Sequence, residues 1–192
     1  MREPRSRTAL LAVLVVAVAF SLPAAASRAD ARGVNGPALS TLPSHTAFAQ
    51  RPHPYTFIIV ARHSVKCLEV ADASVDNGAN VVQRTCDESL NQQWSFLYLE
   101  NNRYLMVARH SHKCLEVADA SLEDGANVVQ STCNGGANQQ WSFYHVGGNS
   151  YLAVARHSHK CLEVADASLE DGANVDQWTC DGGTNQQWSL GY

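Results

Sequence analysis

The chain has 192 residues, of which 45% are hydrophobic, and its formal net charge at pH 7 is −4. This length accommodates one medium-sized domain with additional segments. Because the charge balance is acidic and no basic cluster follows residue 26, we expect neither nucleic acid nor an anionic membrane surface as a partner.

The first 26 residues are typical of a secretory signal peptide. Arg2, Arg5 and Arg7 precede an apolar run over residues 9–20, and Pro-Ala-Ala-Ala at 23–26 offers a small-residue cleavage site. A membrane-spanning helix is the alternative, but it needs roughly 20 apolar residues. We therefore predict export, from a bacterium as the Ala-rich leader suggests, with a mature net charge near −6 after the loss of three Arg and one Glu.

Residues 27–54 read as a linker. They contain Pro37, Pro43, Pro52 and Pro54 among small and polar residues, with no apolar period. Such a composition does not bury enough apolar surface to order a chain, so we expect little fixed structure here.

The remainder, residues 55–192, consists of three near-copies of one segment, at about 57–103, 104–150 and 151–192. Each copy contains Gln-Gln-Trp near its end, and the tryptophans Trp94, Trp141 and Trp188 are spaced 47 residues apart. A fixed period without slippage indicates one supersecondary unit used three times. Three equal units favour a closed ring, which would repeat any surface site three times.

Each copy predicts four short strands. In the second copy these are residues 104–110, 113–119, 127–133 and 139–145, with apolar residues alternating as in Leu115 and Val117. Asn-Gly or Asp-Gly turns separate the second and third strands of each copy. Twelve short strands in three sets fit a closed, barrel-like all-β domain in which residues 55–60 lie beside the last strand.

Six cysteines in an exported chain suggest disulfides. Each copy contains two cysteines, 19 residues apart, and this regularity selects one pairing among the 15 that six cysteines allow. The predicted disulfides are Cys67–Cys86, Cys114–Cys133 and Cys161–Cys180. Metal thiolates are the alternative, but no C-x-x-C pair supports them.

The repeated order Cys-Leu-Glu-Val, Gln-x-Thr-Cys and Asn-Gln-Gln-Trp resembles the ricin B-type lectin family over residues 55–192. The resemblance implies a β-trefoil of three 47-residue repeats with about twelve strands and one disulfide per repeat. It also implies shallow sugar pockets, one for each repeat. In such a pocket an aromatic ring stacks on the C–H face of the sugar, and carboxylate and amide groups bind its hydroxyls.

By this resemblance the third repeat matches the pocket pattern best. Glu163 takes the carboxylate position, Trp178 the stacking position and Asn185 the amide position, while Gln186 orients Glu163. The corresponding residues are Glu69, Asn91 and Gln92 in the first repeat and Glu116, Asn138 and Gln139 in the second.

The sequence departs from the family pattern at three positions. Arg84 and Ser131 replace the stacking ring in the first two repeats. Glu replaces the usual Asp in every copy, and a further family glutamine is replaced by Val82, Val129 and Asp176. Galactose specificity is therefore not implied.

Each of these residues also has a structural interpretation. The repeated tryptophans are expected in the core, the Glu residues could be solvated or pair with Lys66, Lys113 and Lys160, and the Asn residues could cap turns. His110 with His112, and His157 with His159, form H-x-H pairs on predicted strands that could suit Zn²⁺. The first repeat does not keep the pair, so we expect surface histidines and no metal.

The leading hypothesis is a secreted, non-catalytic lectin that needs no cofactor and binds a glycan or polysaccharide, with galactose-type or cell-wall sugars as candidates. An enzyme is disfavoured because neither G-x-S-x-G nor H-E-x-x-H occurs. A trefoil that binds or inhibits proteins without binding sugar is the alternative, since fold alone does not decide between these functions.

Overall fold

The computed structural model describes residues 56–191. The predicted signal peptide (1–26) and linker (27–54) lie outside this part of the chain. The described strands are β1 (Thr56–Ala61), β2 (Cys67–Val70), β3 (Ala79–Arg84), β4 (Gln93–Tyr98), β5 (Arg103–Ala108), β6 (Cys114–Val117), β7 (Ala126–Ser131), β8 (Trp141–Gly147), β9 (Ser150–Ala155), β10 (Cys161–Val164), β11 (Val175–Trp178) and β12 (Gln187–Gly191). Short 3₁₀ turns join them: η1 (Ala71–Ala73), η2 (Leu90–Gln92), η3 (Ala118–Ala120), η4 (Ala137–Gln139), η5 (Ala165–Ala167) and η6 (Thr184–Gln186).

Six strands close into a barrel. Antiparallel pairing runs β1–β4–β5–β8–β9–β12 and returns from β12 to β1. The closing pair has Ile58 opposite Gly191 and Ala61 opposite Trp188, which confirms that the start of the domain lies beside its last strand. Closure leaves no free edge among these six strands.

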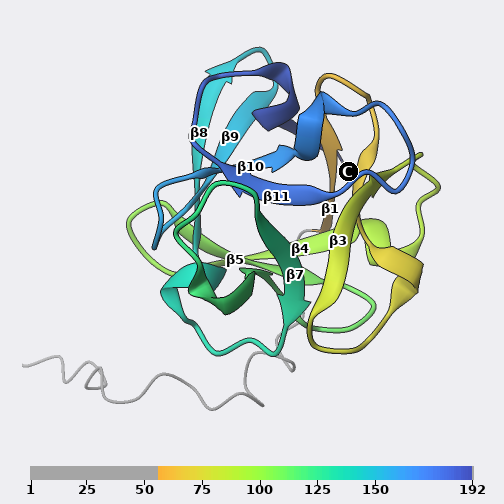
Figure 1. Cartoon of the computed structure of the whole chain (residues 1–192). Helices are drawn as coiled ribbons and strands as arrows, with labels where there is room; N and C mark the ends of the chain where they lie inside the picture. The colour runs from red at the N-terminus through yellow and green to blue at the C-terminus, as the bar shows by residue number, and fades with distance from the viewer. Residues whose placement is uncertain (1–55, 192) are drawn as a thin grey trace, which may run out of the picture. The chain divides into compact units, whose positions relative to one another are not determined.

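The other six strands form three hairpins that make a cap. These hairpins are β2–β3, β6–β7 and β10–β11. β7 pairs with both β3 and β11, and an isolated bridge between Val82 and Asn174 joins the first and third hairpins. Figure 1 shows β3, β7 and β11 converging around one centre. A closed barrel with three capping hairpins is the β-trefoil that the sequence predicts.

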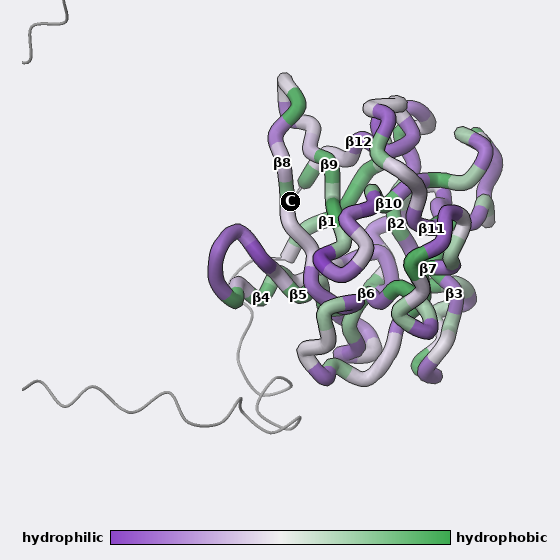
Figure 2. The backbone as a smooth tube through the Cα atoms, turned by 60° about the vertical axis from the view of Figure 1, so that its left-hand side comes forward, coloured by the Kyte–Doolittle hydropathy of each residue, from purple (hydrophilic) through white to green (hydrophobic). Residues whose placement is uncertain are grey.

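The repeated tryptophans fill the core. Trp94, Trp141 and Trp188 are fully buried, and each indole Nε1 donates to a leucine carbonyl of its own repeat at 2.9–3.1 Å. Burying an indole without a partner for its N–H would be costly, so these bonds make the central positions favourable. Hydrophobic stretches of the backbone coincide with strands such as β1 and β9, whereas the loop between β4 and β5 is hydrophilic (Figure 2).

The disulfide prediction is confirmed. Each disulfide joins the first residue of a cap hairpin to the segment that follows the hairpin's second strand, with Cα atoms 5.0–5.1 Å apart. The three are Cys67–Cys86, Cys114–Cys133 and Cys161–Cys180. Each bridge closes a loop inside one repeat, and in the chain-entropy model such a loop contributes roughly 3 kcal/mol to stability.

Buried glutamines connect each repeat to the one before it around the ring. The Gln130 side chain is fully buried, and its Nε2 donates to the carbonyls of Ser74 (2.7 Å) and Asp76 (2.9 Å) in the first repeat. Its Oε1 accepts from Ser111 Oγ at 2.7 Å. Gln83 and Gln177 repeat this pattern toward the third and second repeats.

The histidine pairs do not lie on strands, and that prediction is wrong. His110 and His112 occupy the tight turn between β5 and β6, where His112 has φ 59°. His110 Nε2 bonds the Ser74 carbonyl at 2.8 Å, and His157 Nε2 bonds Ser121 in the same way. A carbonyl only accepts, so Nε2 carries the proton here. Because the strand ends before His110, its period-2 alternation no longer places the two histidines on one face.

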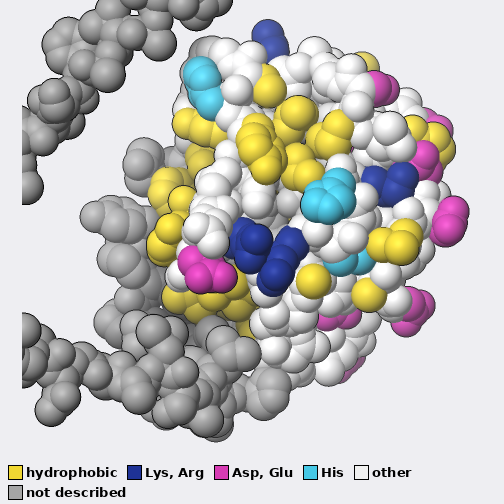
Figure 3. All heavy atoms as spheres, turned by 90° about the vertical axis from the view of Figure 1, so that its left-hand side faces the viewer, with side chains coloured by type: hydrophobic (Ala, Val, Ile, Leu, Met, Phe, Trp, Pro, Cys, Tyr) yellow, Lys and Arg dark blue, Asp and Glu magenta, His cyan; other side chains and the backbone are white. Residues whose placement is uncertain are grey.

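The outer surface mixes residue types. On the face shown in Figure 3, hydrophobic side chains are interspersed with polar ones, and acidic side chains follow the right-hand edge. This agrees with the acidic balance of the sequence.

The inter-repeat amides give a first testable prediction. Gln130→Leu keeps the side chain's approximate volume but removes three hydrogen bonds, to the Ser74 and Asp76 carbonyls and from the Ser111 hydroxyl. Of these groups, the Ser74 carbonyl keeps its bond to His110. We therefore expect the free energy of unfolding to fall by about 2–4 kcal/mol. Urea unfolding followed by tryptophan fluorescence measures it. Glu123→Ala, at an exposed position of the same repeat, is the control, and equal stability of the two variants would contradict the role given to Gln130.

Candidate functional site

A shallow depression lies over the β10–β11 hairpin in the third repeat. Its volume is about 320 Å³. It is bordered by Glu163, Ala165, Asp166, Ala167, Asp176, Trp178, Asp181 and Asn185. The structure thus brings together the carboxylate, the ring and the amide that the sequence assigned to a pocket, and it adds three aspartates that sequence reasoning did not assign to it.

The register of the hairpin places the main groups on one face. Glu163 on β10 lies directly opposite Asp176 on β11, and Trp178 follows Asp176 by two residues. Successive strand side chains alternate between faces, so all three project to the same side. Glu163 and Asp176 are 7% and 6% exposed, whereas Trp178 is 43% exposed. The carboxylates therefore form the floor and the indole a wall.

Gln186 lies beneath the depression and holds Glu163. Its Nε2 donates to Glu163 Oε2 at 2.7 Å and to the Thr179 carbonyl at 3.1 Å, and its Oε1 accepts from the Asp181 N–H at 3.0 Å. The side chain is fully buried. These contacts make Gln186 a positioning residue, and Gln92 and Gln139 hold Glu69 and Glu116 in the same way at 2.7 and 2.6 Å.

The turn η6 and the loop before it supply the amide side of the depression. Asn185 Nδ2 donates to the Val164 carbonyl at 3.1 Å, which fixes the orientation of the carboxamide. Asp181 Oδ1 accepts from the Gly183 N–H at 2.7 Å. A Cβ atom at Gly183 would lie 2.6 Å from Asn185 Oδ1 and 3.0 Å from Asp181 Oδ1, so a glycine is needed for both polar groups to approach.

Trp178 is supported by the second repeat. Gly125 has φ +77°, and a Cβ there would lie 3.5 Å from the Trp178 ring. Gly125 follows Asp124, whose carboxylate accepts from Lys160 Nζ at 2.5 Å and from the Thr179 N–H at 2.7 Å. The residue that follows Trp178 is thus bonded to the turn of the second repeat that contains Asp124.

The floor of the depression is electrostatically unusual. Burial, followed by repulsion from Glu163, Asp166 and Asp124, raises the pKa of Asp176 from 3.8 to about 7. Burial also raises the pKa of Glu163, against the hydrogen bond from Gln186 that lowers it. Asp176 Oδ1 is buried and has no hydrogen-bond partner in the structure. Two adjacent carboxyls with raised pKa values are frequent at functional sites.

The corresponding faces of the first two repeats are different. Glu69 lies opposite Val82, and Glu116 lies opposite Val129, so neither glutamate has a second acid across the hairpin. Arg84 and Ser131 occupy the positions that match Trp178. Asn91 and Asn138 do keep the bond to a valine carbonyl, at 2.9 and 3.1 Å. The scaffold of the site is therefore threefold, but the ring and the second carboxylate belong to the third repeat.

The alternative of Lys–Glu pairing within a repeat is not what the structure shows. Lys66 Nζ binds Asp171 at 2.6 Å, and Lys160 binds Asp124, in each case in a turn of a different repeat. These bonds lower the pKa values of both aspartates. Within residues 56–191, no three His, Cys, Asp or Glu side chains group as ligands for a metal ion.

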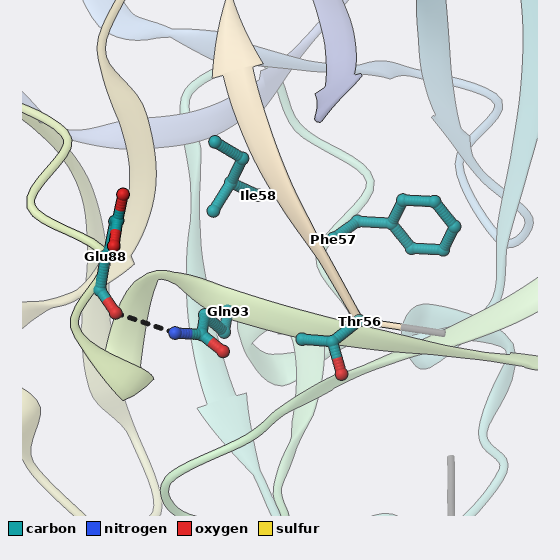
Figure 4. A pocket seen from close by; sticks show the side chains of 5 residues that line it. All are labelled: Thr56, Phe57, Ile58, Glu88 and Gln93. Carbon is teal, nitrogen blue, oxygen red and sulfur yellow. Dashed lines mark hydrogen bonds between the residues drawn. The ribbon is translucent and has the colours of Figure 1, made fainter. Parts of the chain in front are cut away.

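A second depression borders β1 and the turn before β4 (Figure 4). Gln93 Nε2 donates to the Glu88 backbone carbonyl at 2.6 Å there. The Phe57 ring lies across β1 from Ile58, Glu88 and Gln93 (Figure 4). The Phe57 ring and the Glu88 carboxylate therefore do not face the same space, and the third-repeat depression remains the better candidate for a binding site.

The sequence matches the family model of the ricin-type beta-trefoil lectin domain over residues 55–190. Among solved structures, the chain is similar to the designed threefold-symmetric protein ThreeFoil, with 50% identity, a TM-score of 0.71, and coverage of 71% of this chain and 98% of that one. It is also similar to 1,3Gal43A, an exo-β-1,3-galactanase from Clostridium thermocellum, with 41% identity and a TM-score of 0.71 over 72% of this chain and 30% of that one.

A lectin from Macrolepiota procera, solved with lactose, shares the fold at 15% identity and a TM-score of 0.64, with coverage of 74% and 98% of the two chains. A search of curated protein sequences found no match.

The buried acid gives a second prediction. Asp176→Val introduces the residue that repeats one and two carry at this position. Burial raises the pKa of Asp176 in the folded protein, so Asp176 ionises more easily in the unfolded chain. The free energy of unfolding of the wild type should therefore fall, relative to that of Asp176→Val, as pH rises from about 4 to about 7. We expect a relative loss of roughly 1–3 kcal/mol, since water at the open mouth moderates the penalty.

Thermal or urea unfolding at several pH values, with both proteins side by side, measures this difference. A stability difference that does not change with pH would contradict the raised pKa of Asp176.

Proposed function

Because the chain belongs to the ricin-type β-trefoil lectin family, we propose that it is a secreted, non-catalytic protein that binds a glycan or polysaccharide through its third-repeat depression. The observation that carries this proposal is the meeting of Trp178, Glu163 and Asn185 at one solvent-open depression. An exposed indole face, a fixed carboxylate and a fixed amide are the groups that a pyranose ring needs for binding.

The roles of the residues follow from their exposure. Trp178, 43% exposed, stacks against the C–H face of the sugar. Glu163 and Asn185 accept hydrogen bonds from its hydroxyls, while buried Gln186 keeps Glu163 in place. Glu69, Asn91, Glu116 and Asn138 would offer only the polar half of such a site, because no ring accompanies them.

One principal pocket predicts weak binding of a single sugar unit. A Kd near 1 mM corresponds to about −4 kcal/mol, which one stacked ring and a few hydrogen bonds can supply. Stronger binding to a polysaccharide would need the first two repeats to contribute through avidity.

Export is part of the proposal. Three disulfides within residues 56–191 suit an oxidising compartment, and the charged and apolar start of the sequence suits a signal peptide. The similarity to a galactanase covers only 30% of that enzyme, so the enzyme's activity is not carried over to this chain.

The ring gives the third prediction. Trp178→Ala should reduce binding on a glycan array to background, because stacking on one aromatic ring supplies much of the free energy of a shallow site. Arg84→Ala and Ser131→Ala, at the matching positions of the other repeats, should leave binding within about twofold of wild type.

Binding that survives Trp178→Ala and falls with a substitution at Arg84 or Ser131 would move the site to another repeat. A protein that binds no glycan while capturing a protein ligand equally well with and without Trp178 would support the protein-interaction alternative instead.

A further inference from the structure

The third-repeat depression is lined by four carboxyl groups. These are Glu163, Asp166, Asp176 and Asp181. None of the four takes part in a salt bridge within residues 56–191, where Lys66, Arg103 and Lys160 pair with other acids. The nearby lysine, Lys160, is already bound to Asp124. The depression thus concentrates negative charge without a cation of its own.

One of these groups is unsatisfied. Asp176 is 94% buried, and its Oδ1 has no hydrogen-bond partner. It borders the depression directly across the hairpin from Glu163. A buried carboxylate without a partner is costly, and at the same position the other repeats have Val82 and Val129, each also 6% exposed. A valine would therefore fit at position 176, and we infer that a ligand accounts for the acid found there.

We propose that the third-repeat depression binds a sugar carrying a free protonated amine, such as a hexosamine unit of a de-N-acetylated polysaccharide, with its ammonium between Asp176 and Glu163. This rests on the proposed function and names the ligand class of the same site. An ammonium has three donors and no acceptor, which matches a floor of carboxylate oxygens.

The wall of the site suits the same ligand. The exposed Trp178 indole offers its face to the sugar ring, and a cation near that face gains further attraction. A neutral hydroxyl would leave the charge of the floor uncompensated, and N-acetylation would remove the positive charge of the ligand. The site therefore selects for the free amine through charge as well as shape.

Charged groups around Asp176 set how binding depends on pH. Glu163 faces it from β10, Asp166 from η5, Asp124 from the turn before β7 and Asp181 from the loop after β11, while the β7 residue opposite it is the neutral Asn127. Because burial, followed by repulsion from Glu163, Asp166 and Asp124, raises the pKa of Asp176 to about 7, affinity for the amine should rise between pH 5 and pH 7 as Asp176 ionises.

The test is a titration of the purified protein by heteronuclear NMR, following the indole N–H signal of Trp178. The ligands are glucosamine and galactosamine, each compared with its N-acetyl derivative and with the parent hexose, in buffer with EDTA. We expect at least one free amine to bind about tenfold more tightly than its two neutral counterparts, and this preference to disappear in Asp176→Val and Asp176→Asn.

Two controls accompany the titration. Asp119→Asn removes the acid that matches Asp166 in the second repeat, and it should leave the preference for the amine intact. Unfolding curves of the Asp176 variants establish that they are folded, which Val82 and Val129 in equivalent positions already indicate for valine.

The outcomes separate the two proposals. Equal affinity for the amine and the neutral sugars, unchanged in Asp176→Val, overturns the amine proposal while the lectin function stands. An amine preference that persists in both Asp176 variants also overturns it, since the floor then plays no part. Absence of binding to every sugar, free amines included, overturns both.

Discussion

The fold depends on buried glutamine amides that join each repeat to its neighbour. Gln83, Gln130 and Gln177 are fully buried, and each donates twice to backbone carbonyls of the preceding repeat around the ring. Each amide oxygen also receives a serine hydroxyl from its own repeat. Because a single hairpin cannot bury these groups alone, the three units are stable only as a closed set.

A second set of buried glutamines uses the same chemistry beneath the cap glutamates. Gln92, Gln139 and Gln186 fix the cap glutamates from below, so the scaffold presents three carboxylates in equivalent places. In the proposed function, binding depends on where the symmetry is broken. Trp178 and Asp176 convert the third of these places into a depression with a wall and a second acid, whereas Arg84, Ser131 and two valines leave the others incomplete.

The position of Asp176 illustrates how stability and binding oppose each other. Its burial raises the pKa to about 7, which means that the folded protein resists holding the charge. A ligand that supplies a positive charge would relieve this penalty, so the feature that costs stability in the free protein is the one that favours a cationic ligand.

The sequence by itself determined the three repeats, the tryptophan core, the disulfide pairs and a closed all-β domain, because each follows from a 47-residue period that needs no knowledge of contacts. The resemblance carried by the repeated motifs then specified the trefoil. The same resemblance assigned Glu163, Trp178 and Asn185 to a pocket, and the departure of Trp178 from the repeat marked it as an exposed position. The resemblance already implied that Gln186 orients Glu163, and the hydrogen bond between them confirms it. Only the tertiary structure decided that Asp176 faces Glu163 and that Lys66 and Lys160 pair across repeats. Strand register and closure of the ring bring together residues that the linear spacing does not relate, which is why these contacts could not be predicted from the sequence.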